Sequence, residues 1–155
     1  MSYPTQPGRV VTVSSLRLLV DVGNSRIKFG LFNESQETNG LPKCWHSTTV
    51  NVRTTCPWSQ IRGWRPEEEL ETLQSVVAGA NPQEIARVMK AWPEEWNPPT
   101  EVDYAPDFFP LKVALPEPKK AGIDRLLNAV AAARIRQPQQ AVLIVDTGTA
   151  TTVDV

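Results

Sequence analysis

The sequence has few of the residues that build disulfide or metal sites. Its 155 residues include only two cysteines, Cys44 and Cys56, and one histidine, His46. Three such side chains on an irregular spacing do not match a structural zinc pattern, and two cysteines do not make a disulfide framework. We therefore expect these three to be ordinary residues rather than ligands of a metal.

Long apolar runs and a charge excess are also missing. No apolar run approaches the roughly 18 to 20 residues that span a bilayer, and the N-terminus lacks the basic-then-apolar layout of a signal peptide. The formal net charge of -1 gives no basic field that would attract nucleic acid. We therefore expect a cytoplasmic protein that binds neither nucleic acid nor membrane.

What the sequence does contain fits one globular domain. A chain of 155 residues is long enough for one ordinary core but short for two full-sized domains. Hydrophobic residues make up 41% of the chain and charged residues 21%, which is the balance of a globular protein. Residues 1–15 are polar, contain proline and glycine, and precede the first strong pattern, so we predict a flexible leader there.

The residues after the leader have the character of strands. Two short apolar runs, 16–21 and 26–32, are separated by Gly-Asn-Ser, which predicts an antiparallel hairpin. A third strand is expected near residues 43–50. Residues 53–66 contain two prolines and two tryptophans without a clear period, so we interpret them as a loop or insertion.

Further along, predicted helices alternate with strands. Proline followed by acidic residues predicts helix starts at Pro66 and Pro82, and residues 75–81 and 100–105 predict strands on either side of the second helix. Apolar residues at a spacing of three and four predict an alanine-rich helix over residues 123–136, which a strand, a turn and another strand follow. The predicted class is α/β, with an antiparallel three-strand meander and parallel strands in one mixed sheet flanked by helices.

One short pattern occurs twice. Residues 18–25 read LLVDVGNS and residues 143–150 read LIVDTGTA, so Asp21 and Asp146 each follow an apolar run and precede glycine and small polar residues. Such a glycine lets the backbone turn and expose N–H groups, the hydroxyls donate to phosphate oxygens, and the aspartate can hold a hydrated cation. Two facing loops would grip a polyphosphate, whereas either loop alone is also consistent with a hairpin turn with a capping aspartate. Lys28 is either a phosphate contact or an exposed strand residue.

Three segments in order carry a resemblance to a known family. They are DVGNSRIKFGLF at 21–32, AGIDRLLNAVAAA at 121–133 and VDTGTATTVDV at 145–155. Together they resemble the type III pantothenate kinases, the first enzymes of coenzyme A synthesis, within the superfamily of actin, hexokinase and Hsp70. The resemblance implies a ribonuclease-H-like (actin-like ATPase) domain at 16–138 with a linking helix at about 123–136, and a truncated second domain beginning at 139–155.

The resemblance also implies an activity and its ligands. The expected reaction is the ATP-dependent phosphorylation of pantothenate to 4'-phosphopantothenate, with Mg²⁺ and a monovalent cation, K⁺ or NH₄⁺. The full-length protein is expected to be a homodimer. Because a cleft between two domains cannot close when one is missing, we expect the chain by itself to have little or no activity.

Roles for single residues follow from the family motifs. Asp124, in Gly-x-Asp-Arg, is the expected catalytic base, while a cap or helix-dipole role is the local alternative. Gly122 leaves room for the substrate. Arg125 is expected to bind the carboxylate of pantothenate, with a surface ion pair as the alternative. The residues expected to bind the nucleotide phosphates are Asp21, Gly23, Asn24, Ser25, Lys28, Gly148 and Thr149. Asp21 is also the expected ligand of Mg²⁺, and Asp146 that of the monovalent cation.

One position departs from the family pattern. Leu115 stands where family members commonly have a tyrosine that lines the pantothenate pocket, and a leucine cannot replace the hydrogen bond of the phenol. Either the pocket is apolar there or the acceptor differs. Two other functions remain open: a non-catalytic nucleotide- or metabolite-sensing or transcriptional accessory protein of the same family, and a kinase for a sugar or another small alcohol.

Overall fold

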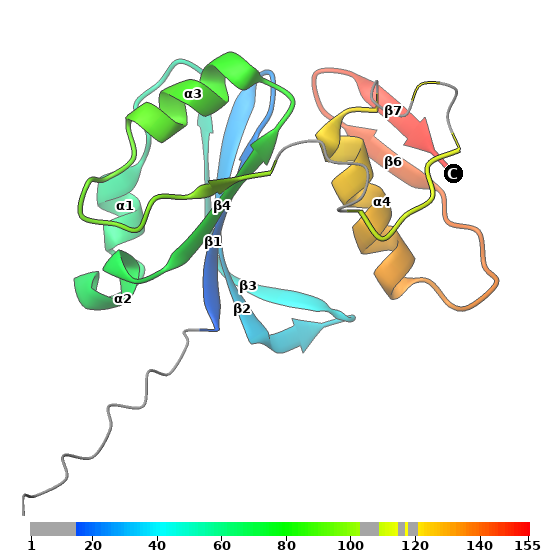
Figure 1. Cartoon of the computed structure of the whole chain (residues 1–155), viewed down its shortest axis with the longest axis horizontal. Helices are drawn as coiled ribbons and strands as arrows, with labels where there is room; N and C mark the ends of the chain where they lie inside the picture. The colour runs from blue at the N-terminus through cyan, green and yellow to red at the C-terminus, as the bar shows by residue number, and fades with distance from the viewer. Residues whose placement is uncertain (1–14, 103–108, 115–116, 118–120) are drawn as a thin grey trace, which may run out of the picture.

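The computed structural model describes residues 15–102, 109–114, 117 and 121–155 (Figure 1). Apart from Ser15, the predicted flexible leader lies outside the described residues. Leu115 and the end of the strand predicted at 100–105 lie outside them as well. No helix among the described residues is long and apolar enough to cross a membrane.

A five-stranded mixed sheet forms the larger part of the molecule, with the strand order β3-β2-β1-β4-β5. The strands are β1 (Leu16–Val22), β2 (Arg26–Thr38), β3 (Leu41–Asn51), β4 (Gln74–Gly79) and β5 (Thr100–Glu101). The first three form an antiparallel meander, and β4 pairs in parallel with both β1 and β5. The predicted α/β class, with its meander and parallel strands, is confirmed.

Three helices lie together on one side of this sheet (Figure 1). They are α1 (Trp58–Arg62), α2 (Glu67–Glu71) and α3 (Pro82–Lys90). The alternation of β1 places Leu16, Leu18, Val20 and Val22 in the core with apolar residues of these helices, such as Ile61 and Val88. The odd positions of β1, which include Asp21, therefore face the other side of the sheet.

The helix starts read from the sequence are confirmed, but the loop assigned to residues 53–66 is wrong. Pro66 is the N-cap of α2, and the Asn81 side chain caps α3 by accepting a hydrogen bond of 3.2 Å from the N–H of Glu84. Residues 53–66 instead include α1, whose Ile61 is fully buried. A helix of five residues with one buried side chain is too short to show a 3.6-residue period, which explains the error.

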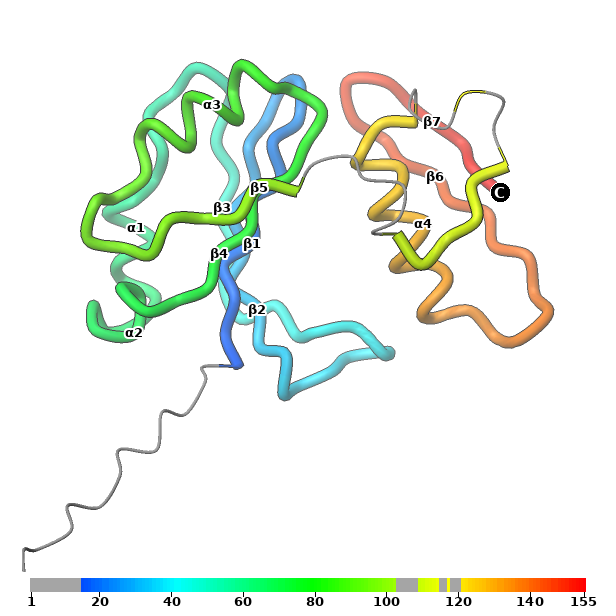
Figure 2. Tube along the Cα trace, in the orientation of Figure 1, coloured from blue at the N-terminus to red at the C-terminus, as the bar shows by residue number. Residues whose placement is uncertain are grey.

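A smaller unit lies across the sheet from the first three helices (Figures 1 and 2). It consists of α4 (Ile123–Ile135) and a separate two-stranded sheet of β6 (Ile144–Thr147) and β7 (Thr151–Asp154). The tip of the β2–β3 hairpin reaches the end of α4, where Arg134 donates hydrogen bonds to the carbonyl oxygen of Gly40 at 2.8 Å and to Glu37 Oε1 at 2.9 Å. The sheet face that carries Asp21 thus looks toward α4 and the second hairpin.

Candidate functional site

The turn between β1 and β2 forms one wall of the site. Asp21, next to the last residue of β1, lies directly opposite Lys28 of β2, and the Lys28 ammonium donates a hydrogen bond of 2.9 Å to Asp21 Oδ2. The pKa of Lys28 is raised, first by this hydrogen bond and then by the negative charge of Asp21. The turn is closed by the N–H of Gly23, which donates to the carbonyl oxygen of Arg26 at 2.9 Å. Lys28 is therefore bound to the carboxylate that precedes the loop.

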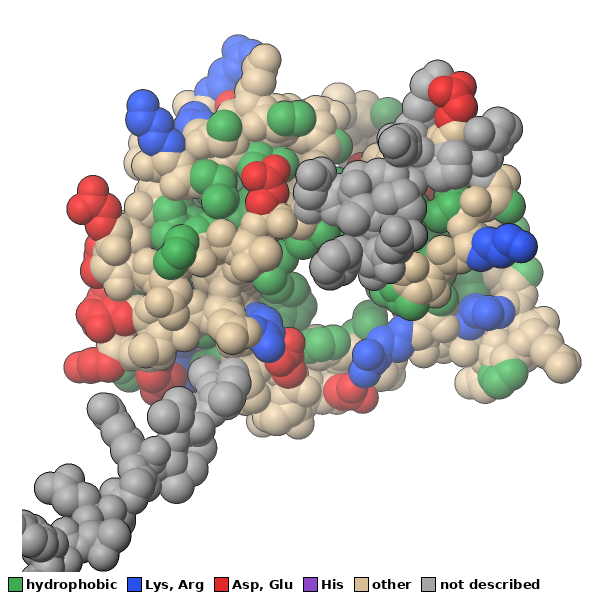
Figure 3. All heavy atoms as spheres, in the orientation of Figure 1, with side chains coloured by type: hydrophobic (Ala, Val, Ile, Leu, Met, Phe, Trp, Pro, Cys, Tyr) green, Lys and Arg blue, Asp and Glu red, His purple; other side chains and the backbone are tan. Residues whose placement is uncertain are grey.

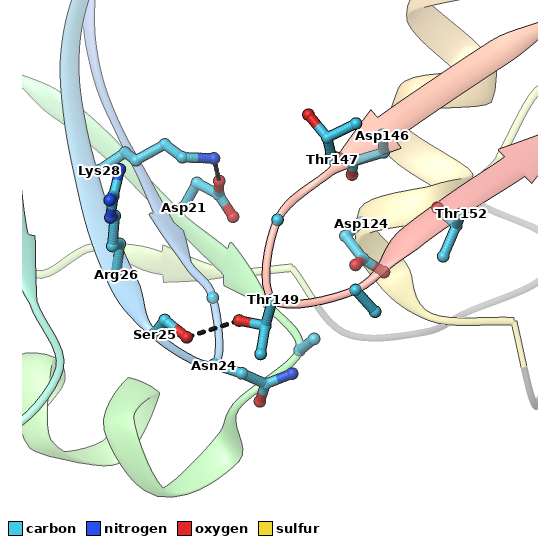
Figure 4. Close-up of a pocket in the computed structure, with 14 residues that line it drawn as sticks. Asp21, Asn24, Ser25, Arg26, Lys28, Asp124, Asp146, Thr147, Thr149 and Thr152 are labelled. Atoms are coloured by element: carbon cyan, nitrogen blue, oxygen red, sulfur yellow. Dashed lines mark hydrogen bonds and ion pairs between the residues drawn. The ribbon is translucent and has the colours of Figure 1, made fainter.

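The turn between β6 and β7 forms the facing wall. Asp146 lies opposite Thr152 in the β6–β7 register, and the N–H of Gly148 donates to the carbonyl oxygen of Ala150 at 2.9 Å. The two turns meet, since the hydroxyl oxygens of Ser25 and Thr149 are 2.5 Å apart (Figure 4). The structure therefore brings the two similar sequence patterns together, although 124 residues separate these hydroxyls along the chain.

A cavity of about 720 Å³ lies between the two turns. Figure 4 shows its lining, and Figure 3 shows that the molecule is hollowed between its two parts. The lining consists of Asp21, Gly23, Asn24, Ser25, Arg26, Lys28, Ala80, Asp124, Asp146, Thr147, Gly148, Thr149, Ala150 and Thr152. An adjoining cavity of about 310 Å³ shares Asp21, Lys28, Asp124 and Asp146 with it. These volumes fall in the usual range of small-molecule sites.

Asp124 enters this cavity from the first turn of α4. Its Oδ1 accepts a hydrogen bond of 2.9 Å from the N–H of Arg125, so the carboxylate folds back toward the start of the helix. Gly122 is the N-cap there, and a Cβ atom at this position would lie 2.4 Å from Asp124 Oδ1. The glycine therefore gives the carboxylate the space that it occupies.

Arg125 does not line either cavity but pairs with Asp154 at the end of β7. Its Nε lies 2.9 Å from Asp154 Oδ2 and 3.1 Å from Oδ1, and its Nη2 also donates to Oδ1. Hydrogen bonding and charge raise the pKa of Arg125, while the hydrogen bond from Arg125 lowers the pKa of Asp154. The structure thus contains the ion pair considered as an alternative for Arg125.

Several lining residues were not singled out in the sequence. The amide of Asn128 donates a hydrogen bond of 3.2 Å to Asp146 Oδ2, and Asn128 lines the smaller cavity. Its place four residues after Asp124 was a usable signal, since residues at that spacing share a helix face. Thr147 and Thr152 line the larger cavity, and the run of threonines in TGTATT at 147–152 was the signal for them.

The donors of the site fit a cation that is bound together with phosphate. Among the residues that the structure describes, no three His, Cys, Asp or Glu side chains are grouped so as to hold a metal. Asp21 and Asp146 nevertheless both line the cavity, beside serine and threonine hydroxyls. Mg²⁺ prefers oxygen ligands and is commonly held by one or two carboxylates plus substrate phosphates, so this set suits it.

The chain is similar to known proteins of one enzyme family. The family model of the type III pantothenate kinases matches residues 17–155. Proteins named type III pantothenate kinase from Dehalococcoides mccartyi and Maricaulis maris are 32% and 30% identical to the chain over 92% and 89% of its length. One of the same name from Nitrosococcus oceani is 30% identical over 89%. The chain spans 54%, 53% and 51% of these relatives, about half of each.

Proposed function

Because this chain belongs to the type III pantothenate kinase family, we propose that the complete protein transfers a phosphoryl group from ATP to the primary hydroxyl of pantothenate. The product, 4'-phosphopantothenate, would enter coenzyme A biosynthesis. The observation that supports this most directly is the convergence of two Asp-x-Gly turns and Asp124 on one cavity. Since the chain spans about half of its relatives, the proposal concerns the complete protein.

The two turns are suited to bind the phosphates of a nucleotide. Ser25 and Thr149 present hydroxyls from opposite walls, and phosphate oxygens would replace their mutual hydrogen bond of 2.5 Å as acceptors. The backbone N–H groups of such turns and the ammonium of Lys28 supply further donors. Phosphoryl transfer needs charge neutralisation and positioning more than covalent chemistry, and the donors of these two turns would contribute to both.

Asp124 is the proposed acceptor of the proton of the attacking hydroxyl. Its carboxylate lines the same cavity as both turns, so a hydroxyl bonded to it would share that cavity with a phosphate bound by the turns. A positioned base of this kind contributes about 10² to 10⁴ in rate. Mg²⁺, held near Asp21, would neutralise charge on the phosphates, and Asp146 is the proposed contact of a monovalent cation, K⁺ or NH₄⁺.

The wider setting is also part of this proposal. Homodimer formation and a cytoplasmic location are inferred from the family and from the composition of the chain. Gly148 joins Thr149 in the second phosphate turn, and Gly122, Arg125 and Leu115 belong to the acceptor side. The chain by itself would have little activity, because phosphoryl transfer needs a closed, water-poor site.

The first test measures ADP release by the complete protein. With ATP, Mg²⁺ and pantothenate, we expect turnover that increases with K⁺ or NH₄⁺ and that falls by about 10² or more in Asp124→Asn, because the base is removed without a change of shape. Glu94→Gln is the matched control, because Glu94 is an exposed carboxylate that lines neither cavity, and it should leave the rate unchanged.

Absence of pantothenate-dependent ADP under every cation would contradict the proposal. The departure at Leu115 would then direct attention to another small alcohol. A protein that bound nucleotide without turning over any acceptor would instead fit the sensing role of a non-catalytic relative.

A further inference from the structure

An ion pair with several hydrogen bonds joins α4 to β7 outside the lining of the two cavities. Arg125 meets Asp154 through three hydrogen bonds, the two from Nε measuring 2.9 and 3.1 Å. The Asp154 side chain is only 24% exposed and that of Arg125 39%. Bidentate pairs of this kind fix the orientation of a guanidinium more firmly than a single contact does.

A guanidinium group has two edges that can each receive a carboxylate. Asp154 uses the side edge of Arg125, which Nε and Nη2 form. The terminal edge, formed by Nη1 and the second hydrogen of Nη2, has no hydrogen-bond partner among the described residues. Arginine has five N–H donors in a rigid plane, so a carboxylate on one edge leaves the other free for a second carboxylate.

The position of Arg125 next to Asp124 suits an acceptor that is charged at one end. In pantothenate the primary hydroxyl and the carboxylate are at opposite ends, so the groups that bind them must point in different directions. Successive residues of an α-helix diverge by about 100° because a turn holds 3.6 residues. This explains why Asp124 lines the cavity while Arg125 does not.

We propose that Asp154 is a positioning residue for the acceptor: it holds the side edge of Arg125 so that the terminal edge binds the acceptor carboxylate. This inference rests on the proposed function. An arginine that is already fixed loses less rotamer freedom when the acceptor binds. Asp154 therefore favours acceptors that carry a carboxylate over neutral analogues of the same shape.

The test compares two acceptors in the complete protein. Steady-state kinetics are measured with pantothenate and with panthenol, in which an alcohol replaces the carboxylate. In Asp154→Asn we expect the ratio of kcat/KM for pantothenate to kcat/KM for panthenol to fall about tenfold, mainly through KM for pantothenate. Glu37→Gln is the matched control, because Glu37 pairs with Arg134 at the other end of α4, and it should leave the ratio unchanged.

A second variant guards against a simple loss of folding. Arg125→Lys keeps the charge but cannot bind two carboxylates in one plane, so it should lower the ratio as well. The double variant Asp154→Asn with Arg125→Lys should fall little further, because both changes remove one interaction. Equal losses for the two acceptors would reveal a merely structural role and overturn the inference.

The remaining outcomes separate the two proposals. A ratio that does not move in Asp154→Asn, or that rises because Asp154 competes with the acceptor for Arg125, overturns the inference while pantothenate turnover by the wild type stands. A wild-type protein that does not turn over pantothenate contradicts the proposed function and overturns this inference with it.

Discussion

At the scale of single residues, the site depends on where one carboxylate is allowed to lie. Asp124 Oδ1 occupies the space that a Cβ at Gly122 would need, at 2.4 Å from it. The backbone of Gly122 is extended, with φ of -60° and ψ of 146°, so alanine can adopt it. The glycine is thus needed for space rather than for backbone freedom.

Gly122→Ala is therefore predicted to impair catalysis without unfolding the protein. The new methyl group should displace the Asp124 carboxylate and lower kcat of the complete protein about tenfold or more, since small misplacements of a reacting group are costly. The free energy of unfolding should change by less than about 1 kcal/mol. Steady-state kinetics and a urea titration measure the two effects.

Gly63→Ala provides the comparison for that variant. Gly63 also lies at a helix end, where a Cβ would be 3.3 Å from the carbonyl oxygen of Gln60, but it is remote from the cavity. The kcat of Gly63→Ala should equal that of the wild type. An unchanged kcat in Gly122→Ala would show that the carboxylate adapts to the methyl group.

At the scale of elements, α3 is tied to the loop after β3 by a buried carboxylate. Glu84 Oε2 accepts hydrogen bonds from the N–H of Arg53 at 3.1 Å and from Arg87 Nε at 2.8 Å. The bond from the Arg53 backbone is the largest cause that lowers the pKa of Glu84 below 4.5. The ionised side chain therefore holds the loop against the helix.

This lowered pKa predicts how stability depends on pH. A depressed folded-state pKa contributes stability above the unfolded value and loses it as the pH falls through the folded value. The wild type should thus exceed Glu84→Gln in free energy of unfolding by the largest amount at neutral pH. This difference should shrink as the pH falls below 4.5. Urea unfolding of the chain at several pH values measures it.

Glu94→Gln serves as the exposed control in this series. It should follow the wild type at every pH. If the difference between the wild type and Glu84→Gln stayed constant across the acid range, the hydrogen bonds from Arg53 and Arg87 would not stabilise the ionised form.

At the scale of the whole molecule, the five-stranded sheet with its three helices buries more apolar side chains than the part formed by α4, β6 and β7. The sheet and its three helices enclose a continuous apolar core. In α4, Leu126 is the only buried residue, and no residue of β6 or β7 is buried. Large apolar side chains of this part, such as Leu143 at 64% and Val153 at 58%, are exposed.

Backbone amides of α4, β6 and β7 are therefore predicted to exchange with solvent faster than those of β1 and β2. Local opening costs less free energy where few apolar contacts are broken. Hydrogen exchange of the isolated chain, followed by mass spectrometry at neutral pH, measures this difference. Equal protection of the two parts would show that the contacts of Arg134 and Thr149 suffice to hold the smaller part rigid.

Local patterns determined most of the elements. The alternation in 16–22 makes one face of β1 apolar whatever its neighbours are, and the Pro-then-acid start with periodic apolar residues fixes α3. The two Asp-x-Gly patterns likewise predicted a turn after each strand, because glycine and small polar residues favour tight turns. Helix α1 was not predicted, because five residues are too few to show a helical period.

Only the tertiary structure decided which side chains meet. The sequence places Arg125 beside Asp124 on α4, but the fold directs Asp124 into the cavity and Arg125 to Asp154 at the end of β7. Asn128 reaches Asp146 for the same reason, since α4 packs beside β6 and β7. Propensity and period act over a few residues, whereas a hydrogen bond between distant residues depends on how whole elements pack, and that is not encoded in any local pattern.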